Sequence, residues 1–251
     1  MADPSLKELL ASSSLSFTGT VEEVGASAVP DVPADDRTVI AKVGQLLHGP
    51  RGFLPPDSRV TVRLSPDLPP LGVGEQAAFF VNGLVYGDNL AVSEVGRTST
   101  EQAAAPTAQL AGLAEPVSPV ESTLVELAQD EIVEHARAVA AIVRGQITGL
   151  ASAPISGPPR EHDPQWWIAT LAYDLVAKGD LDEAGGTVAV LYANSIDVAW
   201  RESPKPKAGQ AGLWLLHATE GEQAGLAPFA LLHAIDLQPS IQLNLLRERG
   251  I

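Results

Sequence analysis

Two stretches of the sequence share one pattern: GEQAAFFVNG at 74–83 and GQAGLWLLHA at 209–218. Each of them belongs to a series of five apolar stretches, most of which alternate apolar and polar residues as half-buried β-strands do. The series in the first half comprises residues 17–24, 39–43, 59–64, 77–81 and 90–95, and the series in the second half comprises residues 143–150, 169–173, 187–192, 209–216 and 229–235. A chain that repeats five strands in one order is expected to fold into two similar β domains, so the sequence predicts an internal duplication.

The spacing between matching residues supports this interpretation. Gly19 matches Gly145, which is 126 residues later, and Phe79 matches Trp214, which is 135 residues later. The changes in spacing fall between the strands, where insertions are tolerated. The repeated stretches are therefore expected to be the fourth strand of each copy.

A helix is predicted before each copy. Asp3 and Pro4 are expected to act as N-cap and first helical residue of one helix. Ser118 and Glu121, with Pro119 between them, form the capping-box pattern that begins the other. Apolar residues then recur every three or four positions and predict one buried stripe, formed by Val125, Ala128, Ile132, Ala136 and Val139.

These elements predict a mainly β protein with two tandem five-stranded OB-like β-barrels, each preceded by a short helix. Closure into a barrel removes the exposed edges of such short strands. The expected domains are residues 1–96, an Ala/Pro-rich linker at 97–117, and residues 118–251, which include a C-terminal extension. A β-sandwich is the alternative, although it usually has seven or more strands.

The order of the motifs is GTV, V-x-V, a K/H-G step, V-x-V and G-x-x-x-x-F-F. In this order the chain resembles OB-like barrels of the tissue-inhibitor-of-metalloproteinase and netrin type over residues 5–96 and again over about 124–236. That family inhibits proteases through an amino-terminal cysteine that binds the protease zinc, and disulfides brace its barrel. This chain has no cysteine. The resemblance therefore implies a fold and transfers no functional residue.

The composition argues against several classes of function. The 251-residue chain has a formal net charge of −15, so it would repel a phosphate backbone, and we expect no nucleic-acid partner. Without cysteine it cannot form disulfides, thiolate metal sites or a thiol nucleophile. No apolar run approaches the ~20 residues of a membrane span, and the first residues do not resemble a signal peptide. We expect a cytoplasmic protein without membrane contact, with a trimmed secreted form as the alternative.

Motifs for catalysis or cofactor binding are scarce. GVGEQA at 72–77 matches a dinucleotide fingerprint, but prolines precede it and a strand follows it, so we expect a turn. His48 lies in another predicted turn, and His135 lies on the second helix. If the strands that end near His217 and His233 pair, these two imidazoles approach each other, but two ligands do not complete a metal site. The sequence therefore predicts no metal and no cofactor.

One dense polar cluster precedes two adjacent tryptophans. Adjacent residues of a strand face opposite sides, so one tryptophan is expected in the core and the other on the outside, where tryptophan often anchors a protein interface. Consecutive polar residues rarely converge on one atom, so a solvated loop is expected before them. The candidate interface residues are Arg160, Glu161, His162, Asp163, Trp166 and Trp167.

These observations predict a non-catalytic protein-binding or assembly module made of two related β-barrels. Its partner is expected to be another protein, and the sequence does not predict the oligomeric state. The alternatives are an enzyme with a site near residues 160–163 and a binder similar to a protease inhibitor.

Overall fold

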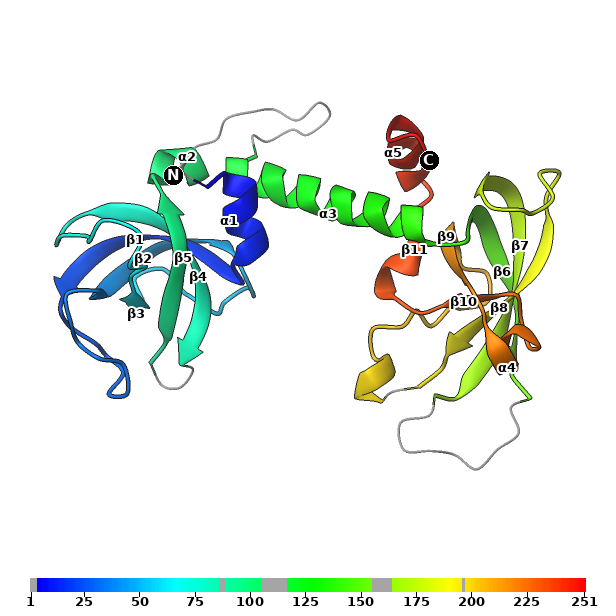
Figure 1. Ribbon diagram of the computed structural model, residues 1–251, viewed down its shortest axis with the longest axis horizontal. Coiled ribbons are helices and arrows are strands. Elements are labelled where there is room, and N and C mark those ends of the chain that lie inside the picture. Colours follow the sequence, from blue (N-terminus) through cyan, green and yellow to red (C-terminus); the bar gives the residue numbers. More distant parts are fainter. Residues whose placement is uncertain (1–3, 86–88, 105–116, 155–163, 196) are drawn as a thin grey trace. The chain divides into compact units, whose positions relative to one another are not determined.

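The chain contains two closed five-stranded β-barrels, as predicted (Figure 1). The structure is a computed structural model, and it describes residues 4–85, 89–104, 117–154, 164–195 and 197–251. The chain divides into two units, Met1–Ala128 and Gln129–Ile251, with one barrel in each. The mainly β fold class is thereby confirmed.

The first barrel has the strand order β1-β2-β3-β5-β4, in which β4 pairs again with β1. The pair β3–β5 is parallel, and the other neighbouring strands are antiparallel. Two short helices, α1 and α2, pack on its outer side. The elements of this unit are α1 (Leu6–Ser12), β1 (Leu15–Val24), β2 (Thr38–His48), β3 (Arg59–Arg63), β4 (Gln76–Val85), β5 (Ala91–Thr98) and α2 (Thr100–Ala104).

The second barrel repeats this topology with the order β6-β7-β8-β10-β9. Here β10 is parallel to β8 and antiparallel to β9, and a short strand, β11, continues the sheet beyond β9. The C-terminal extension forms β11 and a helix. The elements that follow α2 are α3 (Pro119–Ala138), β6 (Ala141–Ser152), β7 (Trp166–Lys178), β8 (Gly186–Ala193), η1 (Val198–Trp200), β9 (Ala211–Ala218), α4 (Gly221–Ala224), β10 (Phe229–Leu231), η2 (Ala234–Asp236), β11 (Leu237–Gln238) and α5 (Gln242–Glu248).

The two barrels also share their irregularities. The first strand of each shifts register at three matching places: Ser16/Phe17, Thr18/Gly19 and Val21/Glu23 in β1, and Ile142/Val143, Arg144/Gly145 and Ile147/Gly149 in β6. The amide of Gly74 donates to the carbonyl of Val21 at 2.8 Å, and the amide of Gly209 donates to the carbonyl of Ile147 at 2.8 Å. Since bulges set where a strand bends, the two barrels bend their first strands at the same residues.

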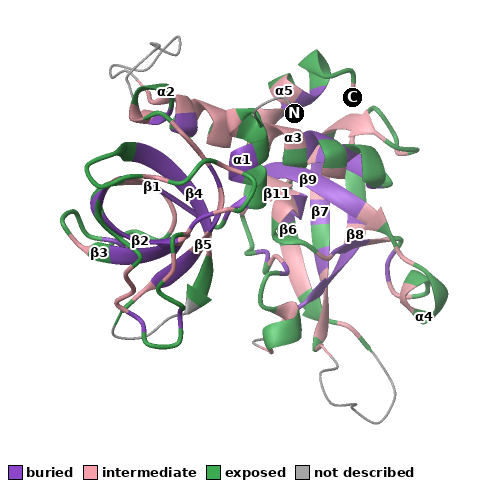
Figure 2. Ribbon diagram, turned by 60° about the vertical axis from the view of Figure 1, so that its left-hand side comes forward, coloured by how far each residue is buried: buried purple, intermediate pink, exposed green. Residues whose placement is uncertain are grey.

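The repeated sequence pattern corresponds to β4 and β9, the fourth strands of the two barrels. Both strands are apolar on both faces because a barrel interior lies on one side and helices cover the other (Figure 2). In β4, Phe79 points into the barrel and Phe80 packs against α1. In β9, Trp214 points into the barrel and Leu215 packs against α3. A strand that is buried on both faces loses the alternation of a half-buried one.

The helices begin partly as predicted. Ser118 and Glu121 form the predicted capping box at the start of α3, with the Ser118 amide 2.9 Å from the carboxylate. For α1 the prediction is wrong, because its N-cap is Ser5 rather than Asp3. The side chains of Ser5 and Glu8 accept hydrogen bonds from each other's backbone amides and form a capping box. If Asp3 were the N-cap, Glu8 would not be the third helical residue and could not complete the box.

The apolar stripe predicted along α3 holds only in its second half. Ile132, Ala136 and Val139 are buried against β9 and α5, whereas Val125 is 49% exposed. The first half of the helix uses a different face, on which Val120, Leu124 and Leu127 pack against the outer side of the first barrel. The two halves of the helix contribute to different cores, so a single stripe does not describe it.

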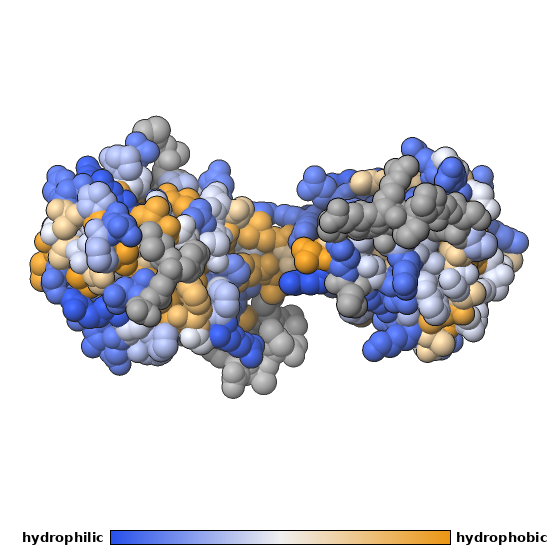
Figure 3. Space-filling view, turned by 90° about the horizontal axis from the view of Figure 1, so that it is seen from below, coloured by the Kyte–Doolittle hydropathy of each residue, from blue (hydrophilic) through white to orange (hydrophobic). Residues whose placement is uncertain are grey.

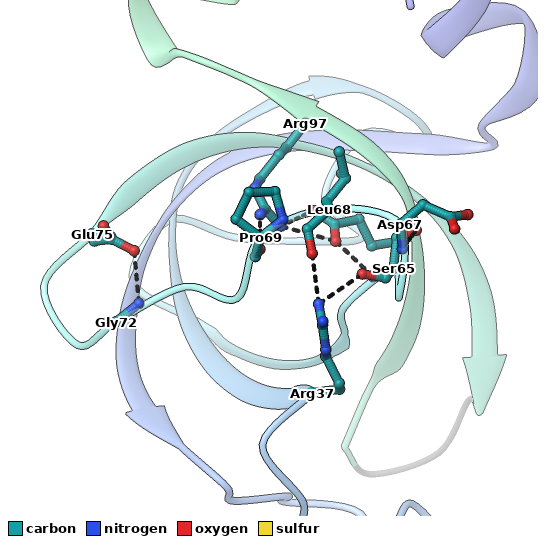
Figure 4. Close-up of polar contacts among 9 residues, drawn as sticks. Arg37, Ser65, Asp67, Leu68, Pro69, Gly72, Glu75 and Arg97 are labelled. Carbon is teal, nitrogen blue, oxygen red and sulfur yellow. Dashed lines mark hydrogen bonds and ion pairs between the residues drawn. The ribbon is translucent and has the colours of Figure 1, made fainter. Parts of the chain in front are cut away.

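The loop at 65–75 crosses from β3 to β4 and is held by arginine side chains (Figure 4). Arg37 donates to the carbonyl oxygens of Ser65 and Leu68 at 3.1 and 2.6 Å, and Arg97 donates to the carbonyl of Pro69. At the end of this loop the amide of Gly72 donates to the carboxylate of Glu75 at 2.6 Å. The predicted turn is confirmed over residues 72–75, since β4 begins directly after it at Gln76 and no helix begins there.

The stretch expected to be the linker, 97–117, includes the end of β5 and the helix α2. Residues 105–116 lie outside the described part of the chain. The boundary between the two units falls later, within α3.

Candidate functional site

Trp166 and Trp167 begin β7, and their rings lie on opposite faces of the strand, as alternation predicts. Trp167 packs against the interior of the second barrel, with its ring centroid 6.5 Å from that of Tyr192. Trp166 lies on the outer side, where its ring meets the ring of Trp200 edge to face at 5.3 Å. Both tryptophans of the strand are half-buried. The outward tryptophan is therefore partly covered by the chain's own 3-10 helix η1.

The turn that carries Trp200 is fixed by polar contacts on both sides. Asp197 caps η1 by accepting a hydrogen bond from the Ala199 amide at 2.8 Å. Lys205 donates from its Nζ to the carbonyl oxygens of Trp200 and Ser203 at 3.0 and 3.1 Å. Lys205 thus stabilises the turn.

Val198, the first residue of η1, is 87% exposed, more than any other large apolar side chain of the described residues. Figure 3 shows one face of the second unit, at the right, on which hydrophilic side chains predominate and apolar ones form small groups. Val198 belongs to the same 3-10 helix as Trp200, and tryptophan is enriched at surfaces that bind another protein. We call Trp166, Val198 and Trp200 the η1 surface.

The other predicted interface residues, Arg160, Glu161, His162 and Asp163, lie outside the described residues. Their role in an interface therefore stays a prediction. Sequence reasoning found Trp166 and did not find Val198 or Trp200, because a valine and a tryptophan in a polar Pro/Gly-rich segment show no periodicity.

A second cluster joins three histidines and an aspartate from separate parts of the second unit. His135 comes from the last turn of α3, His217 from the end of β9, and His233 and Asp236 from the loop that forms η2. The pairing of β9 with β10, which the sequence left conditional, brings His217 near His233. The ring centroids are 5.2 Å apart for His135 and His217, 5.5 Å for His135 and His233, and 5.3 Å for His217 and His233.

Asp236 lies at the centre of this cluster with a fully buried side chain. Its Oδ1 lies 2.5 Å from Nε2 of His135 and 2.9 Å from Nε2 of His217. Its Oδ2 accepts the backbone amides of Leu232 and His233 at 2.6 and 2.8 Å. Burial raises the pKa of this carboxyl, but the hydrogen bonds donated by His217, His233, His135 and Leu232 outweigh burial and hold the pKa below its usual range.

His135 is the residue that sequence reasoning left apart from the others. It was assigned to a helix before the barrel, and only two imidazoles remained. The signal that could have found it is helical spacing, since His135 lies three residues after Ile132 and four before Val139, on the face of α3 that packs against the barrel.

Among the residues that the structure describes, one group offers three side-chain ligand atoms within 4.8 Å of one another. These are His135, His217 and Asp236. His233 stands next to them as a third imidazole. The side chains of His135 and His217 are 17% and 19% exposed, so a small solute can reach the cluster.

Comparison of the chain with protein-family models, with curated proteins and with solved structures found no match. In the described part of the chain, no helix is both long enough and apolar enough to cross a membrane.

Proposed function

We propose that the protein is a non-catalytic binding or assembly protein built from two OB-like barrels, and that it binds another protein through the η1 surface of the second barrel. The observation that carries this proposal is Val198, which is 87% exposed at the first position of η1, the 3-10 helix whose last residue, Trp200, pairs edge to face with Trp166. Burying a valine side chain completely is worth about 1.5–3 kcal/mol, and tryptophan is enriched among the residues that dominate binding energy.

The η1 surface is held in place before any partner arrives. The Asp197 cap and the Lys205 ammonium fix the turn, and Trp166 packs against buried residues of the outer cluster, such as Leu191 and Ala230. A preformed surface loses little conformational entropy on binding, so more of its contact energy appears as affinity.

We propose further that the two barrels arose by internal duplication. The common strand order and the three shared register shifts of β1 and β6 support a common origin. The first barrel has Asp36, Arg37 and Thr38 where the second has Trp166 and Trp167 at the start of its second strand. The aromatic surface is thus a property of the second copy, as expected if one copy acquired the binding role.

The test compares the full chain with two charge substitutions at exposed valines. Val198→Asp places a carboxylate on the η1 surface, and Val73→Asp places one on a loop of the first barrel, where the side chain is 68% exposed. Both variants are expected to melt at the wild-type temperature, because surface substitutions usually change stability by less than about 0.5 kcal/mol. Light scattering first shows whether a second copy of the chain is the partner.

Each protein is then used as bait for lysate of the source organism, and the captured partner is purified and titrated against the same three proteins. The proposal predicts that wild type and Val73→Asp bind one partner with a fixed stoichiometry and that Val198→Asp binds it at least about tenfold more weakly, equivalent to about 1.4 kcal/mol. Equal binding by all three proteins would refute the placement of the surface. A captured protease would favour the inhibitor-like alternative for the same surface.

The enzyme alternative places a site near residues 160–163. The variant His162→Ala distinguishes this alternative from the binding proposal, because it leaves Val198, Trp166 and Trp200 unchanged. Loss of a catalytic turnover in this variant, with the captured partner still bound, would favour the enzyme.

A further inference from the structure

We propose that His135, His217 and Asp236 form a three-ligand binding site for one divalent transition-metal ion, and that the donor set fits Zn²⁺. The site lies within the second unit and is independent of the η1 surface. Two imidazoles and one carboxylate are nitrogen and oxygen ligands of the kind that zinc binds in tetrahedral sites, where a water molecule can take the fourth position.

The spacing of the two ligand rings matches such a site. With Zn–N bonds of about 2.0–2.1 Å and a ring centre about 1.1 Å beyond the bound nitrogen, tetrahedral geometry places imidazole centroids about 5.2 Å apart. The rings of His135 and His217 are 5.2 Å apart. The His233 ring is held separately, because its side chain accepts a hydrogen bond from the Asp236 backbone amide.

The ligand atoms need only small shifts to admit an ion. Tetrahedral bonds of about 2.0–2.1 Å put neighbouring ligand atoms about 3.3 Å apart. Oδ1 of Asp236 lies 2.5 and 2.9 Å from the two Nε2 atoms, so each contact opens by less than about 1 Å when an ion enters. The cluster is closed by hydrogen bonds that an ion replaces, because His135 and His217 then each present a lone pair at Nε2 and keep the proton on Nδ1.

The surroundings orient the carboxylate for this role. Both backbone amides that Oδ2 accepts come from the same loop, so Oδ1 is left to face the histidines. Metal sites commonly have such outer hydrogen bonds, and losing one lowers metal affinity by about 10–100-fold. The Asp236 side chain is fully buried, and its charge would offset one positive charge of the ion.

The ligands come from three elements that are distant in sequence, α3, β9 and the η2 loop. An ion held by all three would tie the second half of α3 to the barrel. An ion that binds only the folded state stabilises that state, and the stabilisation grows with the logarithm of the free ion concentration. The second unit is therefore expected to melt at a higher temperature with zinc.

The experiment uses the full chain, purified without a polyhistidine tag and freed of metal with a chelator. Zn²⁺ is titrated in competition with a chromogenic chelator, and Co²⁺ is added separately to read the coordination geometry. We expect one ion per chain with micromolar or tighter affinity and the intense visible absorption of tetrahedral Co²⁺. His135→Ala and His217→Ala are each expected to weaken Zn²⁺ binding by more than about 100-fold, beyond the effect of losing an outer hydrogen bond.

His48→Ala is the matched control, because His48 lies on β2 of the first barrel and its loss should leave the affinity unchanged. His233→Ala is a second control, because it removes a neighbouring imidazole that is not a ligand, and it is expected to weaken Zn²⁺ binding far less than His135→Ala or His217→Ala. Circular dichroism checks that every variant is folded.

A measurement on the wild-type chain decides the question if a variant fails to fold. Nitrogen NMR of the histidine side chains is expected to show zinc-dependent shifts at Nε2 of His135 and His217 and none at His48. Absence of stoichiometric zinc binding, or binding with unchanged histidine resonances at the cluster, would overturn the proposal and leave the cluster as a hydrogen-bonded link between α3 and the barrel.

Discussion

Replacing Gly145 with alanine tests how the first strand of the second barrel bends. A β-carbon at this residue would lie 2.3 Å from the carbonyl oxygen of Ala172 and 2.9 Å from Cα of Tyr173, both of them backbone atoms of the paired strand β7. At the matching residue of the first barrel, Gly19, the nearest atom would be the carbonyl oxygen of Lys42 at 3.2 Å. The two glycines occupy equivalent register shifts, but only the second has no room for a methyl group.

These distances set the expected magnitudes. Overpacking costs about 1–3 kcal/mol, and we expect Gly145→Ala at the upper end, about 3 kcal/mol, because backbone within a closed barrel must move. For Gly19→Ala we expect about 1 kcal/mol, since a shift of a few tenths of an ångström relieves the contact. With about 4 °C of melting temperature per kcal/mol for a domain of this size, the losses are about 12 °C and about 4 °C.

The sequence supplies a convenient assay. The chain has four tryptophans, and all of them, Trp166, Trp167, Trp200 and Trp214, lie in the second unit. Tryptophan fluorescence therefore follows the unfolding of that unit alone, and calorimetry follows both. Gly72→Ala is the control, because the nearest atom to its β-carbon would be a Glu75 side-chain oxygen at 3.8 Å. A Gly145→Ala protein that melts at the wild-type temperature would refute the reasoning. So would a smaller loss of stability in the second unit of Gly145→Ala than in the first unit of Gly19→Ala.

Two further predictions concern the first barrel. The hydrogen bond from Arg63 holds the pKa of the Asp35 carboxyl in the folded state below its usual value of 3.8. The ionised carboxylate therefore stabilises the folded state fully above pH 3.8, and this stabilisation is lost as the pH falls through the lower pKa of the folded state. Asp35→Asn should therefore lower the melting temperature of the first unit at pH 7, and the difference should shrink in acid; a difference that grows in acid would contradict this. Arg97→Met should cost about 3 kcal/mol, because it leaves the fully buried Glu94 carboxylate without its cation. In urea unfolding, the double variant with Glu94→Gln should recover part of that loss, and additive effects would show that the pair is not coupled.

The strands could be predicted from the sequence because their signals are local. Alternation in stretches such as 59–64 marks a strand with one face buried, and it located β3 to within one residue. The continuous apolar stretches at 77–81 and 209–216 showed that β4 and β9 exist, but the reason for their composition lies in the helices that cover them. That reason is a tertiary contact, which the sequence of the strand does not contain.

The candidate sites were harder to predict, because each combines residues that are far apart in the chain. The sequence predicted that one of Trp166 and Trp167 faces outward without indicating which, and Trp200, which contacts Trp166, comes from a segment without periodicity. His135 lies 101 residues from Asp236, and only the packing of α3 against β9 brings them together. The spacing of two residues along the chain does not reveal such a contact. It can be predicted only once it is known which barrel the face of α3 that carries His135 packs against.

The central claim is that the second barrel binds a partner protein through the η1 surface, and site-specific photo-crosslinking tests it most directly. A photoreactive amino acid is placed at position 198 or, as the control, at position 73 of the full chain, and each protein is irradiated in complex with the partner captured by wild type. We expect a crosslinked adduct from position 198 and none from position 73. An adduct from position 73 alone, or none from position 198 with the complex intact, would contradict it.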